Sequence, residues 1–225
     1  MSSAQIEIAV REWMPQLLVA AGGTLKMTAL AYVLGATVGL LIALAGLSRR
    51  RYLSAPALFY IEIVRGTPAL TQLFLLYFGL ASVGVAIPAF ETAVIGLGLN
   101  YAAYMAEVYR AGIEAIHRGQ REAAQSIGMT YGQSMRYIIL PQAVRVILPP
   151  MANYAISLLK DTSVASLISA PELMLRARDL SSEYYMPMQL YLIAGAIYLV
   201  MAFPLSRAVR RLELALGKGH ATGAS

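Results

Sequence analysis

The sequence predicts an all-α membrane protein with about five transmembrane helices. Of its 225 residues, 58% are hydrophobic and only 13% are charged, whereas a soluble domain carries about 25% charged residues. The charges also cluster, which leaves long tracts with few or none. A soluble protein with buried helices is the alternative, but core helices are usually shorter than the roughly 20 apolar residues that span a bilayer.

Long apolar tracts recur along the chain, and their limits are approximate. They cover residues 24–47, 57–81, 88–113, 147–168 and 190–206. The first tract is uncharged apart from Lys26, and the fifth has no charge. We expect each tract to form one span within a single transmembrane domain, residues 1–225, that ends in a tail over 212–225.

The N-terminal residues 1–22 are predicted to form an interfacial segment. A short helix over residues 6–20 would lie at the membrane surface, where Trp13 suits the headgroup region. The acidic and basic residues near the start, together with the late beginning of the first apolar tract, argue against a cleavable signal.

Basic residues predict the orientation. With five alternating spans, one set of connecting segments is rich in arginine and lysine, and the cytoplasmic side normally holds that excess. This set comprises Arg49, Arg50, Arg51, Arg118, Arg121, Arg136, Arg207, Arg210, Arg211 and Lys218, against Arg11, Lys26, Arg176 and Arg178. We therefore expect the N-terminus outside and the C-terminus inside. This bias accounts for the net charge of +6 without nucleic-acid binding.

A polar segment, residues 114–140, separates the third and fourth spans on the predicted cytoplasmic side. Two short helices are expected, over 120–127 and 131–139, with the second ending at Pro141. Gly128 is suited to a left-handed turn after the first helix, and Thr130 with Gln133 has the form of a capping box. An ordinary helical hairpin and a docking knob with a small apolar surface both fit this pattern.

The residues of this segment resemble a known signature. Glu122-Ala123-Ala124, Gly128 and the run 138–141 match E-A-A-x3-G-x9-I-x-L-P, the signature of permeases in binding-protein-dependent ABC importers. The runs 60–68, 119–123, 141–143 and 159–163 resemble the polar amino acid branch of that family. The resemblance covers about residues 23–211, and Val164 departs from it where leucine is commoner.

The resemblance implies a permease subunit of a type I ABC importer for polar amino acids or close derivatives. It implies a multi-pass protein of the bacterial inner membrane with three partners: a second permease subunit, a cytoplasmic ATP-binding subunit and an external solute-binding protein. In that family the Glu-Ala-Ala segment is the coupling helix, which sits in a groove of the ATPase. The matching docking residues here are Glu122, Ala123, Ala124 and Gly128.

We expect no catalytic, metal or cofactor site in this chain. The phosphate-binding pattern G-x-x-x-x-G-K-S/T is absent, so ATP and Mg²⁺ would be bound by the partner ATPase. The sequence has no cysteine and only two histidines. A secondary transporter driven by an ion gradient is an alternative, although such folds usually show internal repeats. A membrane-embedded enzyme is a further alternative.

Ionisable residues inside the spans are costly and usually face the bundle interior. Two acid–base pairs are spaced three residues apart: Glu62 with Arg65, and Glu107 with Arg110. Each pair shares a helix face, and we expect both to brace the spans, with movement during pore opening as the alternative. Gly66 and Pro68 predict a kink whose freed carbonyl needs a partner such as Arg65.

Lys160 and Asp161 are adjacent, so on a helix they point about 100° apart. One ammonium and one carboxylate in the bundle interior would suit the two charged groups of an amino acid, with Asn100 and Tyr101 supplying hydrogen bonds. The hypothesis is a polar translocation site near mid-membrane built from these four residues. The alternative is that Lys160 and Asp161 pair with other spans or cap a broken helix.

Overall fold

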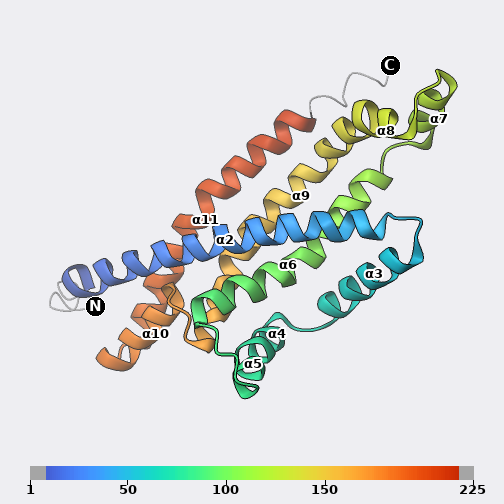
Figure 1. Cartoon of the computed structure of the whole chain (residues 1–225). Helices are drawn as coiled ribbons and strands as arrows, with labels where there is room; N and C mark the ends of the chain where they lie inside the picture. The colour runs from blue at the N-terminus through green and yellow to red at the C-terminus, as the bar shows by residue number, and fades with distance from the viewer. Residues whose placement is uncertain (1–8, 218–225) are drawn as a thin grey trace.

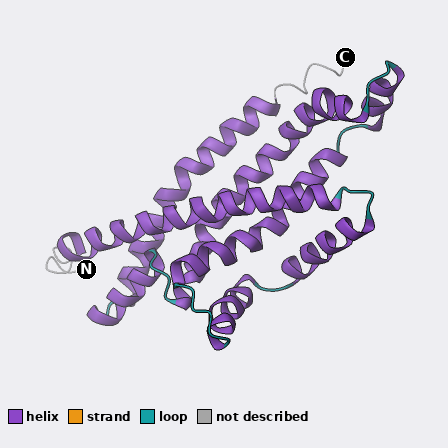
Figure 2. Cartoon of the chain, in the orientation of Figure 1, coloured by secondary structure: helices purple, strands orange, loops and turns teal. Residues whose placement is uncertain are grey.

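The computed structural model describes residues 9–217, and all regular structure in that range is helical. Figure 2 shows helices joined by short loops, without a strand in the described part. The long helices are α2 (Met14–Gly46), α6 (Ala89–Glu114), α9 (Leu140–Asp161) and α11 (Pro187–Gly217). The prediction of an all-α fold is confirmed.

Helix α2 begins earlier than the first apolar tract. A π-helical turn, Ala9–Trp13, leads directly into it, so no separate interfacial helix exists within residues 9–22. Trp13 is 1% exposed and packs on the ring of Tyr184, rather than facing outward as a headgroup anchor would. Pro15 does not interrupt the helix because it stands in the first turn, where its missing N–H is not needed. Residues 1–8 lie outside the described range.

Helix α6 lies at the centre and packs against α2 along small residues. A Cβ atom added to Gly39 would lie 2.8 Å from the Ala102 carbonyl oxygen, and one added to Gly35 would lie 3.1 Å from that of Gly98. The two glycines, spaced four apart, therefore permit a close crossing of two helices in the same subunit.

The second apolar tract is broken rather than kinked. Helix α3 (Arg51–Gly66) ends, two residues follow, and α4 (Ala69–Phe74) starts in a direction that differs by 107°. Pro68 forces the preceding Thr67 into an extended conformation, with φ −121° and ψ 146°, which no helix can include. A π-turn (Leu75–Gly79) and α5 (Leu80–Ser82) complete this segment.

The polar segment forms the two-helix knob that the sequence predicts, residues 114–140. Helix α7 (Arg118–Ser126) ends before Gly128, whose φ is +79°, and the capping box of Thr130 precedes α8 (Tyr131–Ser134). His117, for which no role was predicted, is the N-cap of α7, and its Nδ1 accepts the Gly119 N–H at 3.1 Å.

The predicted stop at Pro141 is wrong. Helix α8 continues through a π-turn (Met135–Ile139) into α9, so the fourth long helix starts at Leu140 instead of near residue 147. The π-turn shifts the hydrogen-bond register just before Pro141, which lets the chain pass a residue without an N–H. Pro149 and Pro150 lie inside this helix.

Beyond α9, a 3₁₀ segment (Thr162–Ile168) leads to α10 (Leu173–Tyr184) and then α11. Helix α11 runs to Gly217, so the first part of the predicted tail, residues 212–225, is helical and the rest lies outside the described range. The knob and the end of α11 lie at one end of the molecule, while α10 and the start of α2 lie at the other (Figure 1).

By length and composition, two described helices can cross a membrane: Arg11–Gly46 and Pro187–Ala215. The bent pair Arg51–Gly66 and Ala69–Ser82 qualifies together, as a broken span or a re-entrant loop. Helices α6 and α9 both contain charged residues and do not meet this criterion, although many residues of α6 are buried by its neighbours. Five spans therefore remain a prediction.

Candidate functional site

A polar cavity of about 550 Å³ lies where the break after α3 meets α6 and α9. It is lined by Arg65, Gly66, Thr67, Pro68, Ala69, Asn100, Tyr101, Tyr104, Tyr154, Ser157 and Asp161. The break in the second tract creates one wall, because two consecutive extended residues expose backbone that a continuous helix would bury. Non-helical backbone at membrane depth is tolerated where it lines a cavity.

Three of the four residues predicted to form a translocation site line this cavity. The Tyr101 hydroxyl donates a hydrogen bond to Oδ2 of Asp161 at 2.7 Å, which links α6 to the end of α9. Asn100, 5% exposed, lies beside them on α6. Lys160 is absent from the lining and is exposed elsewhere, as its angular separation from Asp161 on a helix requires.

Tyrosines form the other wall of the cavity. The rings of Tyr101, Tyr104 and Tyr154 lie within 5.8 to 6.2 Å of one another, between centroids. The guanidinium of Arg65 lies over the Tyr104 ring at 5.5 Å, a cation–π contact. Tyr104 and Tyr154 were not predicted as site residues. Their one sequence signal was spacing: Tyr104 stands three residues after Tyr101, and Tyr154 stands seven residues, about two helical turns, before Asp161.

The Glu62–Arg65 pair predicted from spacing is not formed. Both side chains are exposed, and no ion pair joins them within residues 9–217. Arg65 is the residue before the last of α3, and its guanidinium lies over the Tyr104 ring of α6 instead of pairing along its own helix.

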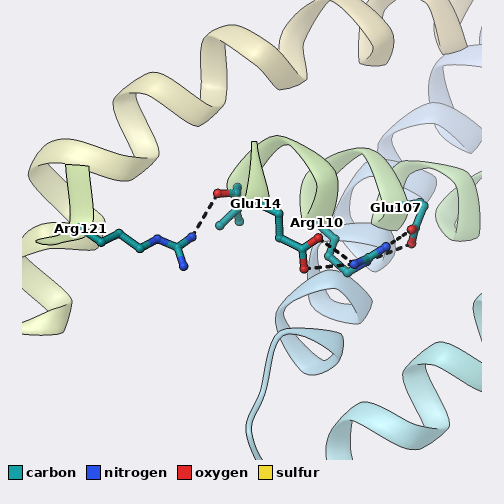
Figure 3. Close-up of polar contacts among 5 residues, drawn as sticks. Glu107, Arg110, Glu114 and Arg121 are labelled. Carbon is teal, nitrogen blue, oxygen red and sulfur yellow. Dashed lines mark hydrogen bonds and ion pairs between the residues drawn. The ribbon is translucent and has the colours of Figure 1, made fainter. Parts of the chain in front are cut away.

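The second pair, Glu107 with Arg110, is joined by an ion pair. Arg110 also binds Glu114 one turn further on, with its Nη1 2.8 Å from Oε2 (Figure 3). The guanidinium therefore bridges two carboxylates along the end of α6. This arrangement stiffens the stretch of α6 that leads into the knob.

Gln72 was not predicted, yet it holds the broken segment in place. Its Nε2 donates to the Val64 carbonyl at 2.8 Å and to the Thr67 hydroxyl at 2.7 Å, and its Oε1 accepts from Asn100 Nδ2 at 3.1 Å. The carbonyl freed by the break thus finds an amide partner, not Arg65. The sequence indicated that a partner was required but not which residue supplied it.

The predicted coupling residues lie at the surface of the knob with one exception. Glu122 pairs with Arg118 at 2.9 Å, and Ala123 and Ile127 are exposed, Ile127 by 76%. Ala124 is only 1% exposed, so it packs within its own chain. No group of three metal-binding side chains occurs among the residues described.

An all-helical bundle with long apolar helices, a polar cavity between them and a compact knob at one end is the architecture of a membrane transport subunit. Residues 35–218 match the family "Binding-protein-dependent transport system inner membrane component". The chain belongs to this family, so it is a permease subunit of an ABC importer, and the prediction made from the signature is confirmed.

Comparison with individual relatives gives the same family. The chain is 41% identical over 187 residues to the probable amino-acid ABC transporter permease protein YckA of Bacillus subtilis, covering 83% of each chain. It is 40% identical over 212 residues to the probable amino-acid ABC transporter permease protein PatM of Vibrio harveyi, covering 93% of this chain and 95% of that one. A chain in the crystal structure of an amino acid ABC transporter with histidines superposes with TM-score 0.89 at 40% identity, covering 92% and 97%. In this family the ATPase is a separate subunit.

Proposed function

We propose that this permease carries polar amino acids or close derivatives across the bacterial inner membrane, driven by ATP hydrolysis in a separate subunit. The observation that carries the proposal is the cavity beside the α3–α4 break, which presents one cation and one carboxylate. Its relatives YckA and PatM are described as amino-acid permeases, which supports the same class of cargo.

The charges of the cavity suit a zwitterion. Arg65 would attract the α-carboxylate and Asp161 the α-ammonium, while the tyrosine faces favour a cation. Arg65 thereby takes the role first predicted for Lys160. Because the two protein charges sum to zero, a cargo without net charge leaves the cavity neutral, which limits the cost of charge within the membrane.

The knob is proposed to be the coupling segment, with Glu122, Ala123 and Gly128 at or beside the surface that meets a cytoplasmic ATPase. Exposed Ile127 adds an apolar contact next to Ala123. Buried Ala124 would act by allowing α7 to lie close to its own chain. ATP and Mg²⁺ would be held by the ATPase.

The proposed assembly contains two permease subunits, identical or related, two ATPases and an external solute-binding protein. The N-terminus would lie outside and the C-terminus inside. The described ends of the chain, at opposite ends of the molecule, are consistent with this orientation (Figure 1). The protein would span the membrane several times.

Reconstituted transport tests the proposal. Liposomes that contain this permease, its ATPase and its binding protein should accumulate a radiolabelled amino acid only when ATP is enclosed on the ATPase side. Omission of the ATPase should abolish uptake. Uptake by the permease alone along an ion gradient would contradict the proposal and favour a secondary transporter.

A further inference from the structure

A second, smaller cavity of about 140 Å³ lies where the loop after α2 meets the knob. Side chains from three parts of the chain converge on it: the loop, α7 and the α8 region. They include Arg49, Arg121, Gln125, Tyr131, Ser134 and Ile139. Neither the transport cavity nor the predicted coupling residues share any of these side chains.

Arg121 is incompletely satisfied. Its Nη2 donates to the Ile113 carbonyl at 3.2 Å (Figure 3), but its Nε is buried and has no hydrogen-bond partner within residues 9–217. A buried donor without a partner costs free energy, so the hydrogen-bonding capacity of this guanidinium is not fully used within the described chain.

The positive charge of this cavity is also unbalanced. Its lining, all within the described part of the chain, contains two arginines and no carboxylate. The acids closest in sequence are engaged elsewhere, since Glu114 binds Arg110 at 2.8 Å and Glu122 binds Arg118 at 2.9 Å. The amide of Gln125 and the hydroxyls of Tyr131 and Ser134 add neutral donors.

We propose that this cavity binds the phosphate group of an anionic lipid headgroup. The forked guanidinium matches phosphate oxygens, and basic pockets between helices at the cytoplasmic membrane surface are typical lipid headgroup sites. Arg49 lies three residues beyond the end of the long apolar helix α2, which places the cavity near the end of the proposed hydrocarbon layer. At about 30 Å³ per water, the volume holds a phosphate but not a nucleotide.

A phosphate between Arg49 and Arg121 would join the first loop to α7. The lipid would therefore help to fix the knob relative to the helices that line the transport cavity. The inference depends on the proposed orientation only for which leaflet supplies the lipid. Lipid binding and ATP-driven uptake are measured separately, so failure of one does not imply failure of the other.

Native mass spectrometry of the purified full chain, titrated with phosphatidylglycerol, tests the site. Arg121→Gln and Arg49→Gln should each weaken binding about fivefold, the contribution of one basic residue near an anionic lipid surface. The matched control is Arg118→Gln on the same helix, whose side chain is 89% exposed and which should change binding by less than about twofold.

Two additions separate the possible sources of phosphate. Zwitterionic phosphatidylethanolamine should bind more weakly than phosphatidylglycerol, and inorganic phosphate at equal concentration should not displace the lipid. Displacement by inorganic phosphate would overturn the lipid assignment in favour of a soluble anion. Equal losses of lipid binding in all three variants, or no loss in Arg49→Gln and Arg121→Gln, would contradict the assignment of the site. Arg49 lies in an exposed loop, so misfolding would not explain a loss in that variant.

Discussion

The Asp161 carboxylate accepts a hydrogen bond from the Tyr101 hydroxyl at 2.7 Å. The rest of the carboxylate is exposed to the cavity. A carboxylate so placed has acceptor capacity left for an incoming ammonium group. Tyr101 orients it from α6, so a side chain of one helix prepares the ligand carried by another. The neighbouring Lys160 has the opposite charge and points away.

Replacement of Asp161 therefore gives a sharp prediction. Asp161→Asn should lower the initial rate of ATP-driven uptake roughly 10- to 100-fold, because a charged hydrogen bond to the cargo is lost. Co-purification with the ATPase should be unchanged. Lys160→Gln is the matched control and should transport normally. An Asp161→Asn variant with the normal rate would remove Asp161 from the site.

Glu172 is a second buried carboxylate, 1% exposed, at the start of α10 outside the predicted spans. It accepts hydrogen bonds from the backbone N–H groups of Met174 and Leu175, at 2.8 and 2.6 Å, and from the hydroxyl of Tyr198 at 2.6 Å. Burial nevertheless raises the pKa of this carboxyl above its ordinary value of 4.5, although these hydrogen bonds oppose the shift. The protonated form is thus favoured more in the folded than in the unfolded chain.

Stability should follow from this difference in pKa. As pH falls through the raised pKa toward 4.5, the folded state gains stability relative to a chain without the carboxyl. The melting temperature of the wild type minus that of Glu172→Gln, measured in detergent, should therefore rise on acidification from neutral pH. A constant difference for Glu172→Gln would contradict the prediction.

At the scale of elements, the α2–α6 crossing depends on the absence of side chains. Only a residue without a Cβ fits at Gly39, where the Ala102 backbone lies 2.8 Å from the added atom. Backbone cannot rotate aside as a side chain does, so the two helices must separate to admit a methyl group.

Gly39→Ala should consequently destabilise the purified protein by about 1–3 kcal/mol, the usual cost of overpacking. Gly22→Ala on the same helix is the control, since an added Cβ there meets nothing within 4 Å. That substitution should be neutral or stabilise by about 0.4–1 kcal/mol. Thermal unfolding in detergent measures both, and equal effects would show that the crossing does not require the glycine.

For the whole molecule, the proposed transport mechanism requires the cavity and the knob to move together, and they lie on connected helices. Helix α6 carries Asn100 and Tyr101 of the cavity and ends in the Arg110 bridge next to the knob. Helix α9 continues without interruption from the knob to Asp161. Displacement of α7 by an ATPase would thus be transmitted along two rigid elements to the cavity.

A substitution on the surface of the knob should uncouple the ATPase from the transport cavity. Ala123→Arg places a long charged side chain on the proposed docking surface and should reduce both ATPase co-purification and uptake more than about tenfold. Binding of cargo to the permease, measured by calorimetry, should be unchanged. Ser182→Arg at the opposite end is the control for ATPase co-purification. Normal co-purification of Ala123→Arg would exclude this surface.

The sequence by itself determined the fold class, the knob with its Gly128 turn and capping box, and the family, since these depend on composition and local spacing. It also indicated Asn100, Tyr101 and Asp161 through the cost of polar groups in apolar tracts. Only the tertiary structure decided which charges meet. Spacing paired Glu62 with Arg65, but the guanidinium of Arg65 lies over Tyr104 of another helix, and Gln72 binds the carbonyl freed by the break. Contacts between helices depend on the directions in which breaks and crossings aim side chains, and residue spacing does not contain those directions.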